Sequence, residues 1–146
     1  MQYWTESGQG VRGSRWQDDC PLCRAGRVHT DLLAKHVPSY IENADALKQA
    51  GVDEIWCLSV NDAFVMGAWA RDQKSAGKVR MLADGSGEFA KAAGLTLDLV
   101  GRGMGVRSNR YSMLVKNGKV VTLNVEAPGK FEVSDGKTLL AQAKAG

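Results

Sequence analysis

The chain has 146 residues, a length that suits one globular domain and is too short for two. Its residues are 44% hydrophobic and 24% charged, which is a composition typical of globular domains. Its net charge of +3 is small and its basic residues are scattered, so we expect no nucleic-acid partner. No apolar run approaches the ~20 residues of a membrane span, and no secretory signal is visible, so we expect no membrane association. The cysteine count of three is odd, which argues against a disulfide framework and favours the cytoplasm.

The sequence changes character near residue 33. Residues 1–33 contain four arginines and no lysine, whereas residues 34–146 contain ten lysines and five arginines. The first stretch shows neither the alternation of a strand nor the apolar spacing of a helix. We therefore expect residues 1–33 to be unstructured and residues 34–146 to form the folded domain.

From Ala34 onward, regular apolar spacing predicts helices that alternate with strands. A first helix is expected to begin at Ala34 and to end at Gly51, and a second, capped by Asn61 or Asp62, to run to about Ser75. The other expected elements are strands over 54–60 and 79–83, a helix over 88–93, hairpin strands over 111–115 and 119–125, and a helix over 138–143 that starts from Ser134.

The dipeptide Asn117-Gly118 separates the two hairpin strands and is the preferred pair for a type I′ turn. Gly101, Gly103 and Gly105 resemble a nucleotide-binding loop in composition only, because no helix opens after them, and we expect a flexible loop. The order of elements predicts an α/β sheet with a mixed edge.

Four blocks of this second part carry a family resemblance: CLSVNDAFV (57–65), KVRMLADGSGEF (78–89), RYSM (110–113) and LNVEAPGKFEVS (123–134). They resemble type II (atypical) peroxiredoxins, which are thiol peroxidases of the thioredoxin-like fold. The resemblance covers 113 of the 146 residues. It implies a partial α/β thioredoxin-like fold that lacks the N-terminal strands and the central strand before the active site.

In the family, the stretch before AKHVP (34–38) should read close to VPGAFTPTCS, with the peroxidatic cysteine in the first turn of a helix. In this chain the same place reads CRAGRVHTDLL. Codons for residues 15–33 can nevertheless be chosen so that reading one base later gives GKTIVLFAVPGAFTPTCS from position 16. We therefore interpret residues 1–33 as an out-of-frame reading of a peroxiredoxin gene.

The resemblance places Leu32 where the peroxidatic cysteine should be, and Ala25 and His29 where the active-site proline and threonine should be. Arg110 matches the arginine that points at the active site. A guanidinium there lowers the cysteine pKa and stabilises the charge that develops as the O–O bond breaks. From spacing alone, Arg110 could equally be a solvated residue that opens a strand.

The cysteines that the chain does contain are weaker candidates for a functional role. Cys57 aligns with a second cysteine of some relatives, but in an apolar run it is expected to be a small buried hydrophobe. Cys20 and Cys23 form a C-x-x-C pair, yet no strand precedes them and only His29 could add a zinc ligand nearby. We therefore expect no metal and no cofactor.

The remaining candidate residues are expected to have structural roles. His36 is expected on a helix surface or at a subunit contact. Trp56, Phe64, Met66 and Trp69 lie at core or interface spacing.

The resemblance implies reduction of hydrogen peroxide and alkyl hydroperoxides through a cysteine sulfenic acid, with glutathione and glutaredoxin or thioredoxin as reductant and homodimers among intact relatives. No cysteine follows Cys57, which favours glutathione or glutaredoxin. The alternatives are an inactive pseudoenzyme or frameshifted fragment, and a thiol oxidoreductase that uses Cys20 and Cys23.

Overall fold

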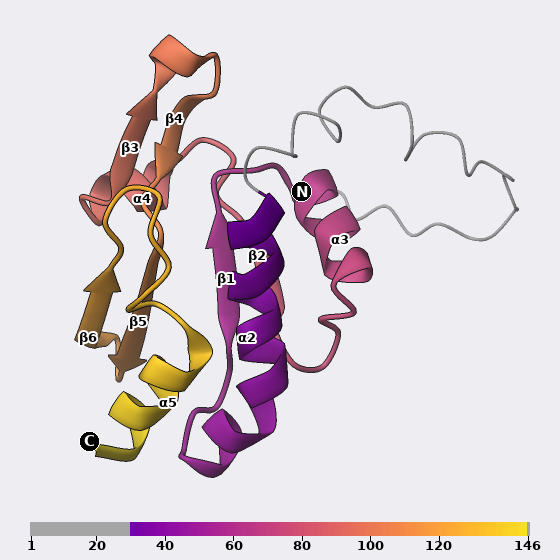
Figure 1. Cartoon of the computed structure of the whole chain (residues 1–146), viewed down its shortest axis with the longest axis vertical. Coiled ribbons are helices and arrows are strands. Elements are labelled where there is room, and N and C mark those ends of the chain that lie inside the picture. Colours follow the sequence, from indigo (N-terminus) through magenta and orange to yellow (C-terminus); the bar gives the residue numbers. More distant parts are fainter. Residues whose placement is uncertain (1–29, 146) are drawn as a thin grey trace, which may run out of the picture. The chain divides into compact units, whose positions relative to one another are not determined.

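The computed structural model describes residues 30–145, with side chains from Lys35 onward. The chain divides into Met1–Thr30 and Asp31–Gly146. The elements in chain order are α2 (Thr30–Gln49), β1 (Trp56–Ser59), α3 (Ala63–Asp72), β2 (Arg80–Ala83), α4 (Glu88–Ala92), β3 (Thr96–Leu99), the 3₁₀ turn η2 (Val100–Arg102), β4 (Gly105–Ser108), β5 (Tyr111–Lys116), β6 (Lys119–Val125) and α5 (Gly136–Ala145) (Figure 1). This alternation confirms the expected α/β class.

The first helix ends as predicted but begins earlier. Gly51 has a φ of +91°, and its N–H donates to the carbonyl of Lys48 while that of Val52 donates to Leu47. These are the two bonds of a Schellman motif, which glycine makes without steric cost. The helix starts at Thr30, so the prediction of coil up to residue 33 was wrong for its last four residues.

Side-chain caps fix the starts of two later helices. Asp62 accepts a hydrogen bond from the N–H of Val65 at 2.8 Å, as predicted, and α3 then ends at Asp72 rather than near Ser75. At α5 the prediction of Ser134 was wrong, because Asp135 accepts the N–H groups of Lys137 and Thr138. A carboxylate at this position also suits the positive end of the helix dipole.

The strands form three separate pairs. β1 and β2 are parallel, whereas β3 pairs with β4 and β5 with β6 in antiparallel fashion. The β5–β6 turn confirms the hairpin prediction, since Asn117 and Gly118 both have positive φ, as a type I′ turn requires. Within residues 30–145, β1 and β5 each pair along one edge only, which agrees with an incomplete sheet.

The β3–β4 hairpin was not predicted. The glycine-rich stretch expected to be a flexible loop instead contains the 3₁₀ turn of η2, and Gly105 is the first residue of β4. Arg107 holds this hairpin against the end of β1, because its guanidinium donates to the carbonyls of Val60 and Met104. The tip of the hairpin remains exposed at Val100 and Val106.

The hydrophobic core joins α2 to α5 and to the β1–β2 pair. Its buried members are Tyr40, Ala44, Leu47, Ile55, Val79 and Leu139. The two helices approach closely at Gly136, whose N–H donates to the Ser39 hydroxyl. A Cβ added at Gly136 would lie 2.5 Å from the carbonyl oxygen of Ser39, so no larger residue fits there without movement.

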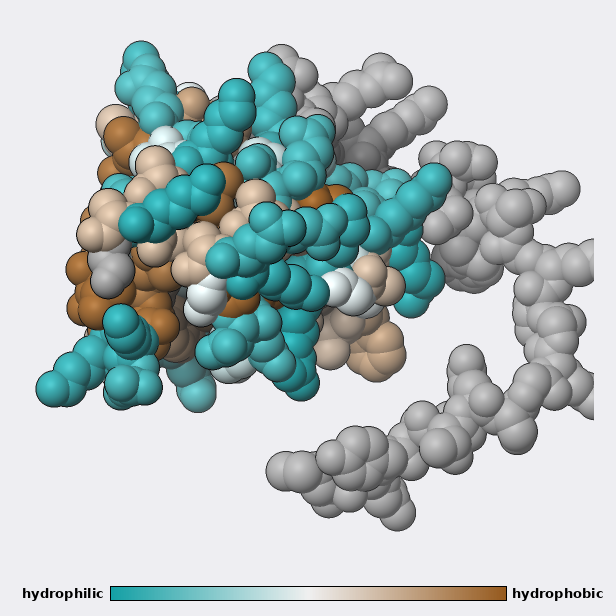
Figure 2. All heavy atoms as spheres, turned by 90° about the horizontal axis from the view of Figure 1, so that it is seen from below, coloured by the Kyte–Doolittle hydropathy of each residue, from teal (hydrophilic) through white to brown (hydrophobic). Residues whose placement is uncertain are grey.

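Several large apolar side chains are exposed. Met66 is buried as expected, but Trp56 is 61% and Phe64 is 89% exposed, so neither is a core residue in this structure. The β5–β6 hairpin is also apolar on its outside, where Val121 and Leu123 are exposed. In Figure 2 hydrophobic side chains gather on the left of the described part, the side on which β5 and β6 lie in Figure 1.

Candidate functional site

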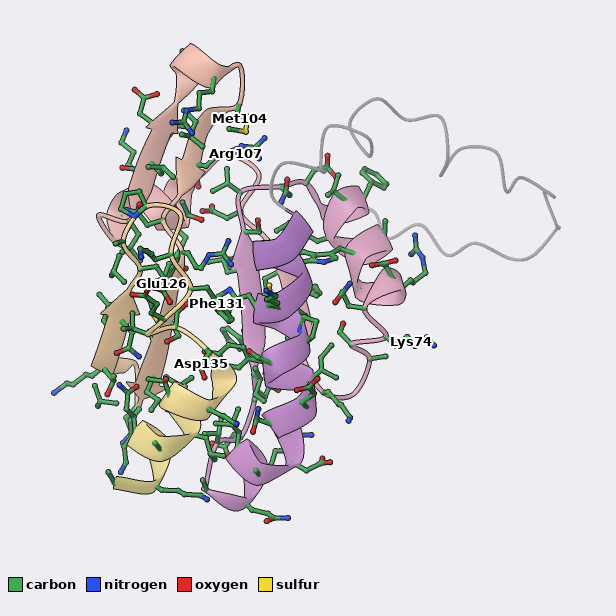
Figure 3. The ribbon with its side chains drawn as sticks, viewed as in Figure 1. Lys74, Met104, Arg107, Glu126, Phe131 and Asp135 are labelled. Atoms are coloured by element: carbon green, nitrogen blue, oxygen red, sulfur yellow. The ribbon has the colours of Figure 1, made fainter. Side chains whose placement is uncertain are left out.

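Arg110 lies between β4 and β5, half-buried, and its position is set by both backbone and ring contacts. Its carbonyl accepts a hydrogen bond from the N–H of Glu126 at 2.9 Å. Its guanidinium carbon lies 5.8 Å from the centroid of the Phe131 ring, a cation–π contact. Glu126, Phe131 and Asp135 follow one another along the segment between β6 and α5 (Figure 3). Two residues of this segment, Glu126 and Phe131, therefore contact Arg110.

His36 and Tyr40 approach the same segment from α2. The Nε2 of His36 and the hydroxyl of Tyr40 both lie 2.9 Å from the carbonyl oxygen of Ser134. The His36 ring also contacts the Phe131 ring edge-on, with centroids 5.3 Å apart. His36 is thus part of the site and half-buried, so the expectation of a helix-surface residue was wrong, and that of a subunit contact stays a prediction.

A buried carboxylate shapes the segment. The Oε1 of Glu126 accepts hydrogen bonds from the N–H groups of Glu132, Val133 and Ser134, each at 2.8 Å. Burial alone would raise the pKa of Glu126, but these three bonds outweigh it and hold the pKa below its ordinary value. Glu126 therefore stays ionised and keeps Phe131 in place for its two neighbours.

The electrostatics of the cluster favour a neutral His36 beside a charged Arg110. Burial lowers the pKa of His36, and the positive charge of Arg110 lowers it further, against the opposing bond to Ser134. Burial also lowers the pKa of Arg110, and the charge of Glu126 opposes that shift. An arginine remains protonated at neutral pH in either case. The cluster consequently holds a half-buried guanidinium beside aromatic rings, with the ionised Glu126 acting on its charge.

The position predicted for the missing nucleophile lies in the first turn of α2. Residue 32 is the third residue of this helix, and its side-chain placement lies outside the described part. His36 comes four residues later and so shares a helix face with position 32. Ala25, His29, Cys20 and Cys23 lie outside the described residues altogether, so the C-x-x-C reading stays a prediction.

Cys57 lies in β1 and packs half-buried against the core cluster. Burial raises the pKa of its thiol to about 11. At neutral pH the thiol is therefore protonated, and the reactive thiolate is nearly absent. The geometry supports the expected role of a small apolar packing residue over a redox role.

The sequence pointed to Arg110 but not to Glu126, Phe131 or Tyr40. All three belong to regular apolar patterns or to a loop, and no spacing rule brings them together. The family-like block LNVEAPGKFEVS did contain Glu126 and Phe131. The length of that block was the only feature of the sequence that could have pointed to these two residues. Among residues with described side chains, no group of three His, Cys, Asp or Glu could hold a metal ion.

Comparison with known proteins gives consistent results. The Redoxin family model matches residues 16–140. Peroxiredoxin-2B of Arabidopsis thaliana is 50% identical over 73% of this chain, which spans only 65% of that relative's length. A peroxiredoxin of Synechocystis is 42% identical over 95% of this chain and 82% of its own. The crystal structure of reduced Prx3 from Vibrio vulnificus in complex with H2O2 has 54% identity and a TM-score of 0.73, covering 78% of this chain and 70% of that one.

No helix in the part that the structure describes combines the length and apolarity needed to cross a membrane.

Proposed function

The chain belongs to the Redoxin family and is a peroxiredoxin, and from this we propose that its form with a cysteine at position 32 reduces hydroperoxides with thiols at the Arg110 cluster. The observation that carries the proposal is the position of Arg110. It is held by Phe131 and by the segment that His36 also touches, one helical turn from position 32. A Vibrio relative was solved with H2O2 bound, which supports a peroxide as the substrate.

The chemistry requires a cysteine at position 32. Its thiolate attacks the distal peroxide oxygen, the O–O bond breaks, and water or an alcohol leaves after protonation, so that the cysteine becomes a sulfenic acid. The dipole of α2 and the charge of Arg110 both favour the thiolate and the developing negative charge. A thiol reductant then returns the sulfenic acid to the thiol through a disulfide, with release of water.

As given, the sequence carries Leu32 at this position and therefore lacks the nucleophile. We propose that the active protein is the one translated in the frame that gives GKTIVLFAVPGAFTPTCS for residues 16–33. The chain with Leu32 is then an inactive form. Cys57 does not replace the missing thiol, because its pKa of about 11 leaves it protonated.

The test compares two full-length proteins, the chain as given and the same chain with residues 16–33 replaced by the in-frame string. We expect peroxide consumption with glutathione and glutaredoxin only from the second protein, and none when serine stands at its position 32. Equal activity of the chain as given, lost on Cys20→Ser or Cys23→Ser, would instead establish the C-x-x-C pair as the redox centre. Resequencing the DNA across codons 1–34 decides which reading exists.

The reductant, assembly and compartment are part of the same proposal. We propose glutathione with glutaredoxin rather than thioredoxin, because no cysteine follows Cys57 to resolve the sulfenic acid within the chain. We further propose a homodimer in the cytoplasm. Rates measured with each reductant, and sedimentation of the restored protein, test the first two statements.

A further inference from the structure

A groove between α3 and β2, the α3–β2 groove, takes no part in the proposed chemistry. Its volume is about 850 Å³, and Val79 and Met81 are among the apolar residues that line it. The basic residues that line it, all of them exposed, are Lys48, Arg71, Lys74, Lys78 and Arg80. They come from α2, α3, the turn after α3 and β2, so they converge only in the folded chain.

The α3–β2 groove carries a net positive charge. Besides the five basic side chains, two acidic ones line it, Asp53 and Glu54, which leaves a net charge of +3. This equals the net charge of the whole chain, so the other charges of the sequence cancel one another. A concentrated positive charge attracts anions.

Fold stability accounts for part of this charge. Lys48 and Arg71 lie in the last turns of α2 and α3, where a cation suits the negative end of the helix dipole. The Nζ of Lys48 also donates to the carbonyl of Gly77 at 3.2 Å. A carbonyl of this kind holds the ammonium group in place but leaves its charge uncompensated.

Carboxylates compensate little of the charge. The guanidinium of Arg80 lies 3.7 Å from the Oε2 of Glu54, and both side chains are more than half exposed. No carboxylate of the described side chains forms an ion pair with Arg71 or Lys74. A single exposed ion pair contributes little, so a ligand of this groove needs several anionic groups at once.

The backbone of Lys74 points to a role for its side chain. Its φ of +51° lies in the left-handed region, where a residue with a Cβ is less stable than glycine. Its N–H donates to the carbonyl of Arg71, and the next N–H donates to that of Ala70, which is a Schellman motif. Figure 3 shows Lys74 after α3, pointing away from the ribbon. The turn itself favours glycine, so the charge of the lysine explains its presence better than the turn does.

We propose that the α3–β2 groove binds an acidic segment of a partner protein. Carboxylates of the segment pair with Arg71, Lys74 and Arg80, and an apolar side chain of the segment packs on the half-buried Met81. The basic residues are spread over four parts of the chain, which suits a segment with several carboxylates better than a lone phosphate. No aromatic side chain lines the groove, which disfavours the stacking of nucleic-acid bases.

The proposal does not rest on the proposed function. Lys48 follows position 32 by sixteen residues of α2, which is about 24 Å at 1.5 Å per residue. A segment bound at the basic residues therefore does not reach the position of the catalytic cysteine.

The test uses the full chain as given and the fluorescein-labelled peptide EEDLLDEE. Binding is measured by fluorescence anisotropy, and the site is located by NMR shifts of backbone amides. We expect saturable one-to-one binding, with the largest shifts at Arg71, Lys74 and Met81. The affinity should fall roughly 10-fold or more when NaCl is raised from about 0.05 M to about 0.5 M, because salt screens exposed ion pairs.

A charge-reversed pair and a matched control locate the contact. Arg71→Glu with Lys74→Glu should weaken binding roughly 10-fold or more, because each reversal replaces an attraction by a repulsion. Lys119→Glu with Lys137→Glu changes the net charge equally at exposed positions outside the groove and should change the affinity less than about 2-fold. Equal weakening by both pairs would overturn the proposal, because overall charge would then explain the binding.

Lys74→Gly separates binding from folding. Glycine suits the left-handed φ, so urea unfolding should show a variant at least as stable as the parent. The same variant should bind the peptide roughly 2- to 5-fold more weakly, because one cation is lost. Unchanged binding of this variant would count against the proposal and overturn it.

Other ligands complete the test. Equal binding of the uncharged peptide QQNLLNQQ, or tighter binding of a thymidine octanucleotide than of EEDLLDEE, would overturn the proposal. The absence of saturable binding at about 1 mM peptide would also overturn it. Peroxidase activity is not measured, so a failure here leaves the proposed function untouched.

Discussion

The guanidinium of Arg110 stands over the ring of Phe131, with its central carbon 5.8 Å from the ring centroid. The ring face attracts the cation without neutralising it, which a carboxylate in the same place would do. Phe131 is itself held by the segment that Glu126 organises through three backbone bonds. Phe131 is therefore one of the contacts that position the guanidinium, and it does so without adding a charge.

A first prediction concerns this pair in the restored protein. Phe131→Leu removes the cation–π contact and should lower kcat/KM for hydrogen peroxide roughly 2- to 5-fold, as expected for a contact worth about 0.5–1 kcal/mol. Arg110→Ala removes the charge itself and should cost on the order of 100-fold or more. Steady-state kinetics of both variants check the order. Equal losses would contradict this prediction, because they would show that Phe131 contributes far more than a cation–π contact.

Leu32→Cys in the chain as given should not restore peroxidase activity. The new thiol would lack the proline, the threonine and the strand that position it, and displacement by about 1 Å costs roughly 100-fold. The rate should stay at least that far below the rate of the protein with the full in-frame segment. A comparable rate from the single substitution would contradict the account of residues 16–33.

The stability of the domain should fall on mild acidification because of His36. Its folded pKa lies below the ordinary 6.5, so the unfolded chain binds more protons at this residue. The contribution of neutral His36 to the free energy of unfolding is therefore complete above about pH 6.5. It declines as the pH falls from there to the folded pKa. Urea unfolding between pH 7 and 5 measures this slope, and His36→Gln should flatten it. Glu126 and Asp135 have pKa values below their ordinary 4.5 and 3.8. Their contributions to stability are therefore lost in a separate, more acidic pH range.

Cys57 should react slowly with alkylating agents. With a pKa raised to about 11, its thiolate fraction at pH 8 is roughly one in a thousand, about 100-fold below that of a thiol of ordinary pKa 9.0. In a Cys20→Ser, Cys23→Ser variant, iodoacetamide should label Cys57 about that much faster in 8 M urea than in buffer. Equal rates would mean that the thiol is accessible and ionised in the folded protein.

Gly136→Ala should destabilise the domain by about 1–3 kcal/mol, because its Cβ would meet the Ser39 carbonyl at 2.5 Å. Gly101→Ala is the matched control, since nothing lies within 4 Å of its Cβ and its φ is not positive. Urea unfolding should therefore separate the two variants. A neutral Gly136→Ala would show that α5 shifts away from α2 at little cost.

Local chemistry explains which elements were predictable. Gly51, Asp62 and the pair Asn117-Gly118 each satisfy a backbone requirement with their own side chain or φ, so sequence alone located those turns and caps. The β3–β4 hairpin was missed because its strands have four residues each and surround glycines, too short for alternation to be seen.

The site was predictable only in part, for a different reason. Arg110 stood out through a block of family sequence, whereas the role of Glu126 depends on N–H groups six to eight residues later that turn toward it. His36 meets Ser134 across 98 residues, and no spacing within one helix indicates such a partner. Contacts of this kind are properties of the folded chain.

The meeting of α2 with the Ser134 segment has a consequence for synthesis. Tyr40 bonds to a carbonyl made 94 residues later, and Leu47 shares a core with Leu139 near the other end of the chain. At about 5–20 residues per second, a ribosome needs roughly 5–20 s to translate from one partner to the other. Throughout that interval the apolar face of α2 is without its final cover. Newly made protein should therefore depend on chaperones until α5 has emerged from the ribosome.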